Sequence, residues 1–206
     1  MKIIKPSIEI LDNITPVGVL KKLELCGRVC YKSEDKITDE SAVKFISNII
    51  KQGHESVLEH VSFSVRFICD RGVTHEMVRH RIASYSQEST RYCNYSKGDF
   101  DGQITVIEPL YLEPGTEKYE IWKQACQQAE DNYFTLLNLG CTPQEARAVL
   151  PNSLKTEIVM TANVREWRHF LKLRTSKASH PQIREVADML LTELNFILPS
   201  LFDDIK

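Results

Sequence analysis

Hydrophobic positions along the chain follow two periods, and together they predict a protein of long helices and a few separate strands. In VSFSVRFIC, residues 61–69, apolar side chains fill every second position, which predicts a half-buried strand. In residues 38–53 they recur three and four residues apart, which predicts a helix that stops at Gly53. The same criteria predict strands at residues 7–13, 103–109 and 154–162, and helices at residues 116–139, 164–173 and 181–198.

Capping residues place two more helix starts. Thr15 and Pro16 predict the beginning of a helix whose first turn Thr15 caps with its side chain. Thr142 and Glu145 form a capping-box pattern, which predicts a short helix through Arg147.

The segment from residue 70 to residue 91 is interpreted from its turn and cap residues. We expect residues 70–72 to turn the chain, and Thr74 to cap a short helix that carries residues 76–81. A hydroxyl-rich turn is then expected between Arg81 and Arg91.

Long helices that alternate with few, well-separated strands favour an α+β fold. We expect a single mixed domain over residues 1–206, with a small, mainly antiparallel sheet and several long helices. Hydrophobic residues make up 42% of the chain and charged residues 26%, as in globular proteins, and no apolar run is long enough to span a bilayer. The N-terminus lacks the apolar stretch of a secretory signal, so we expect a cytoplasmic protein without a membrane partner.

Neither the cysteines nor the histidines have the spacing of a metal site. Cys26 and Cys30 are the one close pair among six cysteines, and no second pair completes a zinc site. Without an export signal, we interpret the thiols as buried and structural. No helical H-x-x-x-H or H-E-x-x-H pattern joins the neighbouring histidines, so we expect no metal ion: these are His54, His60, His75 and His80.

The segment HEMVRHRIASYSQESTRY, residues 75–92, concentrates positive charge in a chain whose formal net charge is only -2. Arg79, Arg81 and Arg91 can bind phosphate oxygens, and four hydroxyls add donors without adding charge. The alternative is that these arginines form surface ion pairs with Glu76 and Glu88. Three arginines and four hydroxyls within thirteen residues favour an anion site; the hydroxyls belong to Ser84, Ser86, Ser89 and Thr90. The small net charge disfavours a nucleic-acid partner.

A second group of basic residues lies nearer the C-terminus. Arg165, Arg168 and Lys172 are three or four residues apart, so they share a helical face that we interpret as solvated. Arg174 falls at the predicted helix end, where its side chain can point into a pocket. Arg147 stands between two alanines in an apolar segment, so we expect it to have a partner.

Four ordered segments resemble one enzyme family. RHR at residues 79–81, followed by seven residues and then SxRY at residues 89–92, resembles the signature of the flavin-dependent thymidylate synthases. Three other segments agree in the same order and extend the resemblance over most of the chain from residue 54 to residue 187: HESVLEH, EARAVLP and NVREWRHFLKLRTSKASHPQIREVA. The combined pattern is far more specific than any single motif.

The resemblance implies a reaction, its cofactors and its site. The family makes dTMP from dUMP with methylenetetrahydrofolate as one-carbon donor and FAD, reduced by NADPH, as hydride carrier, in a pocket between the subunits of a homotetramer. By resemblance the FAD site consists of Ser56, Arg79, His80, Arg81, Gln87, Asn163, Arg165 and His169. The dUMP site consists of Glu76, Arg79, Gln87, Glu88, Ser89, Thr90, Arg91, Arg147 and Arg174. Arg174 would be the catalytic residue, because its charge against the uracil ring stabilises negative charge there.

Two positions depart from the family pattern. Glu76 stands where Gln is usual, and a carboxylate beside a phosphate needs a compensating arginine. His169 stands where Asn is expected, and either ring nitrogen could replace the amide contact to the flavin. No cysteine is expected to be a nucleophile, since Cys93 has no adjacent lysine, histidine or helix start to lower its pKa.

Two other classes of protein compete with the enzyme interpretation. A nucleotide- or RNA-binding module could use the same arginines and stack bases on the tyrosines near them. These are Tyr85, Tyr92 and Tyr95. A purely structural protein gives no reason for Arg147 and Arg174 in apolar segments, and the ordered motifs favour the enzyme.

Overall fold

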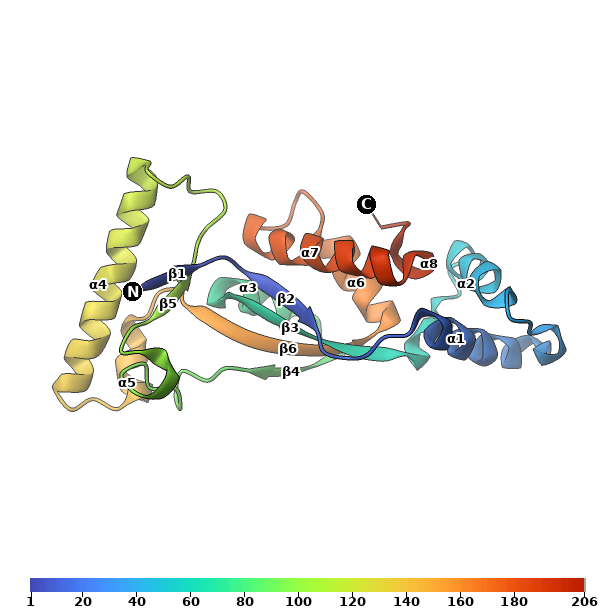
Figure 1. The fold of residues 1–206 in the computed structure, drawn as a ribbon, viewed down its shortest axis with the longest axis horizontal. Helices are drawn as coiled ribbons and strands as arrows, with labels where there is room; N and C mark the ends of the chain where they lie inside the picture. Colours follow the sequence, from blue (N-terminus) through green and yellow to red (C-terminus); the bar gives the residue numbers. More distant parts are fainter. Residues whose placement is uncertain (206) are drawn as a thin grey trace. The chain divides into compact units, whose positions relative to one another are not determined.

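The fold is mixed α+β with a small antiparallel sheet, which confirms the predicted class (Figure 1). The computed structural model describes residues 1–205, except for the side chain of Asp99. Along the four-stranded sheet the order is β2 (Ser7–Ile10), β3 (Ser62–Asp70), β6 (Lys155–Asn163) and β4 (Ala83–Gln87). A second sheet pairs β1 (Lys2–Ile4) in parallel with β5 (Thr105–Ile107), and β1 lies outside the predicted elements.

The helices match the predicted long segments closely. They are α1 (Pro16–Tyr31), α2 (Ser41–Lys51), α3 (Arg71–Met77), α4 (Glu117–Asn138), α5 (Pro143–Ala146), α6 (Val164–Arg174), α7 (Pro181–Ile197) and α8 (Pro199–Phe202). Short 3-10 turns cover residues 34–36, 55–60, 98–100 and 147–149. No helix among residues 1–205 is both long and apolar enough to cross a membrane.

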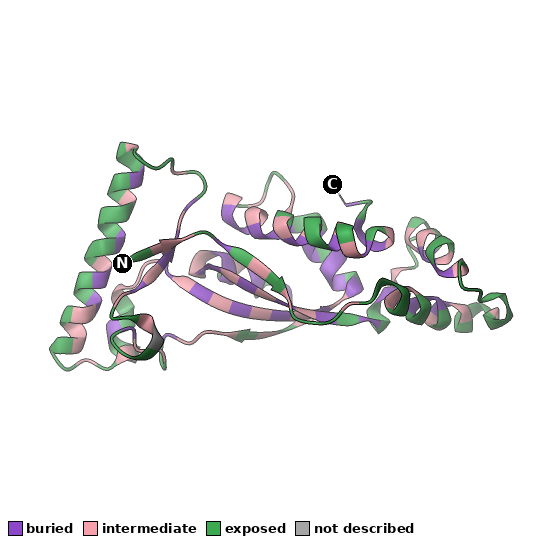
Figure 2. Cartoon of the chain, in the orientation of Figure 1, coloured by how far each residue is buried: buried purple, intermediate pink, exposed green. Residues whose placement is uncertain are grey.

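Period-two alternation shows directly in the longest strands. Along β3 every second residue from Phe63 to Cys69 is buried, as the sequence pattern predicts. Along β6 buried and half-buried residues alternate over the whole strand (Figure 2). Each of these strands therefore presents one face to apolar packing.

Two compact units make up the chain, and the expected single domain stays a prediction. The first unit comprises Met1–Ser7, Phe67–Arg79 and Ser86–Ile158. The second comprises Ile8–Arg66, His80–Tyr85 and Val159–Lys206.

The core of the first unit lies against α4. Its buried members are Tyr95, Ile104, Val106, Cys126, Tyr133, Ala146 and Leu154. Glu130 is the buried carboxylate of this core, and it is satisfied by the backbone N–H of Ile104 at 2.8 Å and the N-terminal amine at 2.9 Å. Thr116 caps α4 with its side chain, and Gly140, at φ 95°, follows its end in the left-handed conformation.

The segment after β3 differs from its prediction. Asp70 does not turn the chain; its Oδ1 accepts the N–H of Val73 at 2.8 Å and caps α3, which begins at once. Thr74 lies inside α3 instead of capping it, and the helix ends at Met77, before Arg79. The expected hydroxyl-rich turn is also wrong, because residues 83–87 form the strand β4.

In the second unit, α1 and α2 pack closely together. Gly27 makes this possible, because a Cβ there would meet the ring of Phe45 at 2.6 Å. Gly53 adopts φ 72° after α2, as predicted. Pro16 begins α1 as predicted, but the side chain of Thr15 accepts no capping hydrogen bond.

Arg168 on α6 is buried, which corrects the interpretation of its helix face as solvated. Its side chain is 1% exposed, and its two terminal nitrogens each lie 2.7 Å from an oxygen of Asp204. It also donates to Glu55 and to the backbone oxygen of Leu201. A buried guanidinium needs this full set of acceptors.

Replacing Arg168 by alanine should lower the free energy of unfolding by about 3 kcal/mol, because it removes a buried, bidentate ion pair. The matched control is Arg165→Ala on the same helix, where the exposed pair with Glu59 is worth less than about 1 kcal/mol. Urea unfolding of both variants measures the difference. Equal losses would contradict the structural role of the buried pair.

Candidate active site

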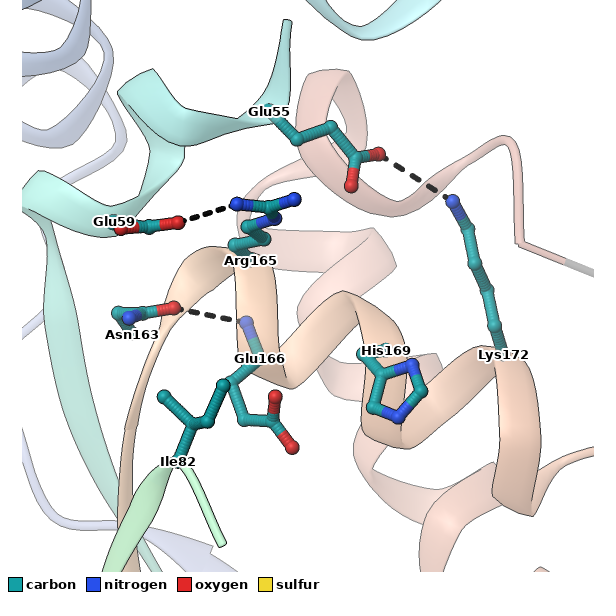
Figure 3. A pocket seen from close by; sticks show the side chains of 8 residues that line it. All are labelled: Glu55, Glu59, Ile82, Asn163, Arg165, Glu166, His169 and Lys172. Atoms are coloured by element: carbon teal, nitrogen blue, oxygen red, sulfur yellow. Dashed lines mark hydrogen bonds and ion pairs between the residues drawn. The ribbon is translucent and has the colours of Figure 1, made fainter. Parts of the chain in front are cut away.

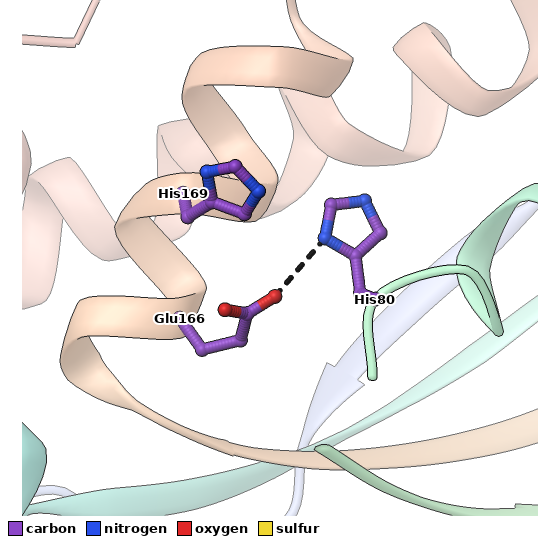
Figure 4. Close-up of side chains that lie close together, drawn as sticks. All are labelled: His80, Glu166 and His169. Carbon is purple, nitrogen blue, oxygen red and sulfur yellow. Dashed lines mark hydrogen bonds and ion pairs between the residues drawn. The ribbon is translucent and has the colours of Figure 1, made fainter. Parts of the chain in front are cut away.

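A chain of three polar side chains, Glu166, His80 and Arg174, occupies the interior of the second unit, and Figure 4 shows the first two of them. His80 is 5% exposed, and its Nδ1 lies 3.1 Å from Oε1 of Glu166. On the other side of the ring, Nε of Arg174 donates to Nε2 of His80 at 3.0 Å. Arg174 is 7% exposed, so its side chain is buried, and its expected place in a pocket stays a prediction.

The helix α6 brings these groups together through its period. Oδ1 of Asn163 accepts the N–H of Glu166 at 2.9 Å and so caps the start of the helix. Glu166, Phe170 and Arg174 follow at intervals of four residues, which places them on one face. The Phe170 ring meets His80 edge-on, with 5.0 Å between centroids.

The hydrogen bonds determine the protonation state of His80. A guanidinium can only donate, so Nε2 of His80 must accept, and the single ring proton of a neutral imidazole lies on Nδ1, facing Glu166. Burial lowers the pKa of His80, the hydrogen bond to Glu166 raises it, and the charge of Arg174 lowers it again. The net direction is downward, so His80 is neutral at neutral pH.

The contacts of His80 also disfavour a metal ion at the neighbouring group of histidines and glutamate. The ligand atoms of His80, Glu166 and His169 lie within 4.8 Å of one another, close enough to hold a metal ion. Both ring nitrogens of His80 are already hydrogen-bonded, and the cation of Arg174 disfavours a second positive charge beside it. A hydrogen-bonded chain explains the cluster better, and the expectation of no metal ion stays a prediction.

A cavity of about 450 Å³ opens beside the cluster, within the second unit (Figure 3). It is lined by Glu55, Glu59, Ile82, Asn163, Arg165, Glu166, His169 and Lys172. The cavity thus brings together three residues of the predicted FAD site: Asn163, Arg165 and His169. Among the described residues that line it, Ser56 and Arg81 do not appear, and both are exposed.

The two cations that line this cavity are each paired with a carboxylate. Arg165 lies 2.6 Å from Glu59, and Lys172 lies 3.5 Å from Glu55. Arg165 is about half exposed, so an anionic ligand could take the place of Glu59 at modest cost.

Several predicted dUMP residues belong to the first unit, among them Gln87 at the end of β4, the loop that follows it, and Arg147; Arg174 belongs to the second unit. The amide nitrogen of Gln87 donates to Thr74 at 3.1 Å and to Thr156 at 3.3 Å. Glu88 is paired with Lys155 at 2.9 Å, so the alternative that it pairs with an arginine of the cluster is wrong. Burial opposes the charge of Lys155, but its bonds to Glu157 and Glu88 raise its pKa.

The loop that follows is closed by its own backbone. The carbonyl oxygen of Ser89 accepts the N–H groups of Tyr92 at 3.1 Å and of Cys93 at 2.9 Å. Thr90 is buried, and its hydroxyl accepts from Arg147 at 3.0 Å. Arg147 therefore has the partner that the sequence predicts, but it is exposed and not enclosed by apolar residues. Arg79 and Arg91 are exposed as well.

All six cysteines are free thiols, and two of them are buried. Cys30 is exposed and Cys26 is half-buried, so the expectation of buried thiols is wrong for this pair. Burial and then the charge of Glu88 raise the pKa of Cys93. This direction agrees with the prediction that Cys93 is no nucleophile, because a thiol must lose its proton to attack.

Sequence analysis missed Glu166 and Lys155, two charged residues at the centre of these groups. Glu166 had a readable signal, since it precedes Phe170 and Arg174 by four and eight residues on a helix with an apolar face. Lys155 has no comparable signal, because its partner Glu88 lies 67 residues away in the chain.

Comparison with known proteins assigns the family. The family model described as thymidylate synthase complementing protein matches residues 15–200. A flavin-dependent thymidylate synthase from Pyrococcus furiosus is 37% identical over 169 residues, 82% of this chain and 68% of its own. One from Geobacter sulfurreducens is 35% identical over 187 residues, 87% of this chain and 79% of its own.

A solved structure agrees with these relatives. The UMP/dUMP methylase PolB from Streptomyces cacaoi, bound with 5-Br dUMP, superposes with a TM-score of 0.78 at 26% identity and covers 98% of this chain and 96% of its own. The protein is therefore an enzyme of the methyltransferase class. The chain belongs to the flavin-dependent thymidylate synthase family.

Removing the ring of His80 should change how stability depends on pH. Its pKa in the folded protein lies below the usual 6.5, so between these two values the unfolded chain binds more protons and stability falls as the pH falls. In His80→Gln this contribution disappears, so the loss of stability below about pH 6.5 should be smaller. Urea unfolding across the acid range measures how the free energy of unfolding changes with pH in the wild type and in His80→Gln. The same change in both proteins would contradict a neutral, buried His80.

Proposed function

We propose that the protein converts dUMP to dTMP, with methylenetetrahydrofolate as one-carbon donor and FAD, reduced by NADPH, as hydride carrier. The observation that carries this proposal is a buried Arg174, held by His80, in a chain that belongs to this family. The relation to a methylase bound with 5-Br dUMP supports a uracil nucleotide as substrate.

The reaction balances with these reactants. The carbon of the new methyl group comes from methylenetetrahydrofolate, which leaves as tetrahydrofolate, and the proton at C5 of uracil is lost. FAD, when bound and reduced by NADPH, would supply the two electrons that turn a methylene group into a methyl group. No other oxidant or reductant is needed.

Part of the lining of this cavity can donate to a flavin nucleotide, which must displace Glu59 and Glu55 from the two cations there. Arg165 and Lys172 provide positive charge for the pyrophosphate, and the NH₂ group of Asn163 is a neutral donor. His169 stands at the cavity wall, where a ring nitrogen can replace the amide that the family pattern expects. These residues support the proposal of FAD, and the remaining proposed contacts, which do not line this cavity, are Ser56, Arg79, His80, Arg81 and Gln87.

The group in the first unit has the chemistry of a nucleotide-phosphate site. Ser89, Thr90 and Arg91 offer hydroxyl, backbone and guanidinium donors within one turn of the chain. The bond from Arg147 to Thr90 positions both side chains. The other proposed dUMP contacts are Glu76, Arg79, Gln87 and Glu88.

Arg174 is proposed to act on the uracil ring. Its fixed charge stabilises the negative charge that develops on N3 and O2 as C5 becomes nucleophilic. A cysteine nucleophile is not needed for this activation, and the raised pKa of Cys93 argues against one.

The burial of the tyrosines weakens the second candidate, an RNA-binding module. Tyr95 is 3% exposed, and the hydroxyl of Tyr85 donates to the backbone oxygen of His80 at 2.7 Å. Of the three tyrosines near the arginines, only Tyr92, at 80% exposure, can stack on a base. One aromatic side chain is too few for a single-strand platform.

Two further proposals rest on the family alone. The protein acts in the cytoplasm, and it is a homotetramer whose subunits share the active site. Light scattering that finds a fully active monomer would contradict the tetramer.

The function is tested by product analysis on the purified protein. With dUMP, methylenetetrahydrofolate, NADPH and FAD present we expect dTMP, and omission of any one should abolish its formation. UMP is the matched alternative substrate, and preference for it over dUMP would change the assigned substrate. Failure to bind FAD in a fluorescence titration, with no dTMP formed, would refute the proposal.

Replacing Arg174 should abolish most of the turnover and leave FAD binding intact. Deleting a preorganised electrostatic contact costs about 100- to 1000-fold in rate, so Arg174→Ala should lose that much dTMP formation. Arg174→Lys should remain severely impaired, because an ammonium group lacks the planar fork of donors that matches adjacent ring acceptors. Near-normal rates in both variants would remove Arg174 from the active site.

A further inference from the structure

We propose that Glu166 is a positioning residue, whose carboxylate holds the ring proton of His80 on Nδ1 so that Nε2 can accept from Arg174 and orient its guanidinium. The catalytic consequence rests on the proposed function of Arg174, but the structural claim does not. Glu166 lies outside the residues that sequence and family resemblance assign to the site.

The geometry of the three side chains leaves one consistent arrangement of protons. The two contacts, 3.1 Å at Nδ1 and 3.0 Å at Nε2, leave neither ring nitrogen without a partner. A proton on Nε2 would face the N–H of Arg174, and two donors repel. The remaining neutral form carries its proton on Nδ1, and that form needs an acceptor at Nδ1, which Glu166 supplies.

The surroundings keep the imidazole from finding another acceptor. The ring is 5% exposed, Phe170 covers its edge, and the hydroxyl of Tyr85 donates to the backbone of the same residue. His169 is the other titratable group beside it, at 5.5 Å between ring centroids. Loss of the Glu166 carboxylate would therefore leave a buried N–H without a partner. Moving the proton to Nε2 removes that cost, and the N–H of Arg174 must then turn away from the ring, because two donors repel.

This proton shift would act on Arg174. Donation through Nε fixes the plane of the guanidinium, and with it the direction of its two terminal nitrogens. An Nε2–H tautomer of His80 breaks that bond and removes this constraint on the plane. The charge of Arg174 would remain, but its alignment with a developing negative charge would be less well fixed.

The test compares Glu166→Ala and Glu166→Gln with the wild-type protein, as purified, by ¹⁵N NMR of labelled histidine. The His80 signal is identified by its absence in His80→Gln. We expect the Nδ1–H form in the wild type, and a shift toward the Nε2–H form in Glu166→Ala. In Glu166→Gln the amide oxygen still accepts, so the Nδ1–H form should persist. A glutamate on the exposed face of α7 provides the control, since Glu193→Gln should leave the spectrum unchanged.

Turnover gives a second readout. We expect kcat to fall about 10- to 100-fold in Glu166→Ala, as when a residue that orients a functional group is removed. The KM for dUMP should change less. Glu166→Gln should recover most of the rate. If the alanine variant does not fold, Glu166→Asp replaces it. Its shorter side chain should not reach Nδ1 and should give the same tautomer shift.

Clear outcomes would overturn the proposal. These are an Nδ1–H form that persists in Glu166→Ala or Glu166→Asp, a wild-type rate despite a shifted tautomer, or a glutamine variant as impaired as alanine. The histidine spectra require no turnover, so a protein that makes no dTMP but shows the expected shift would refute the proposed function and leave the positioning of His80 intact.

Discussion

The hydrogen bond from Arg174 to His80 is the interaction on which the account of the site depends. It joins Arg174 at the end of α6 to His80 in the segment that follows α3. It thereby links a permanent cation to an imidazole that can gain or lose a proton. Because the guanidinium can only donate, it selects a neutral imidazole with a free lone pair at Nε2. Glu166 then completes the selection from the other side of the ring.

Different faces of the helix α6 stabilise the fold and line the candidate site. Arg168 faces a buried set of acceptors that includes Asp204, and so anchors the helix within the second unit. Arg165 and His169 face the cavity, while Glu166 and Arg174 face His80. Most charged residues of this helix therefore have defined partners. The interpretation of its basic face as solvated was wrong for Arg168 alone, since Arg165 and Lys172 are exposed.

Hydrophobic periodicity predicted most of the fold, because the long helices and the half-buried strands bury one face each. It failed where two local signals competed. Asp70 and Thr74 could both cap a helix, and only the observed geometry selects Asp70. The strand β4 has a polar sequence, so only pairing with a distant strand reveals it. The site was likewise predictable only in part. Sequence motifs identified Arg174 and His80, but no local pattern reveals the contact between His80 and Glu166, which are 86 positions apart.

The central claim is that a reduced flavin in this protein provides the electrons for methylating dUMP. An anaerobic single-turnover experiment tests it most directly, with the protein-bound flavin first reduced by NADPH. The account predicts that the flavin reoxidises on addition of dUMP and methylenetetrahydrofolate together, with one dTMP formed for each flavin oxidised. Formation of dTMP while the flavin stays reduced, or reoxidation without dTMP, would contradict it.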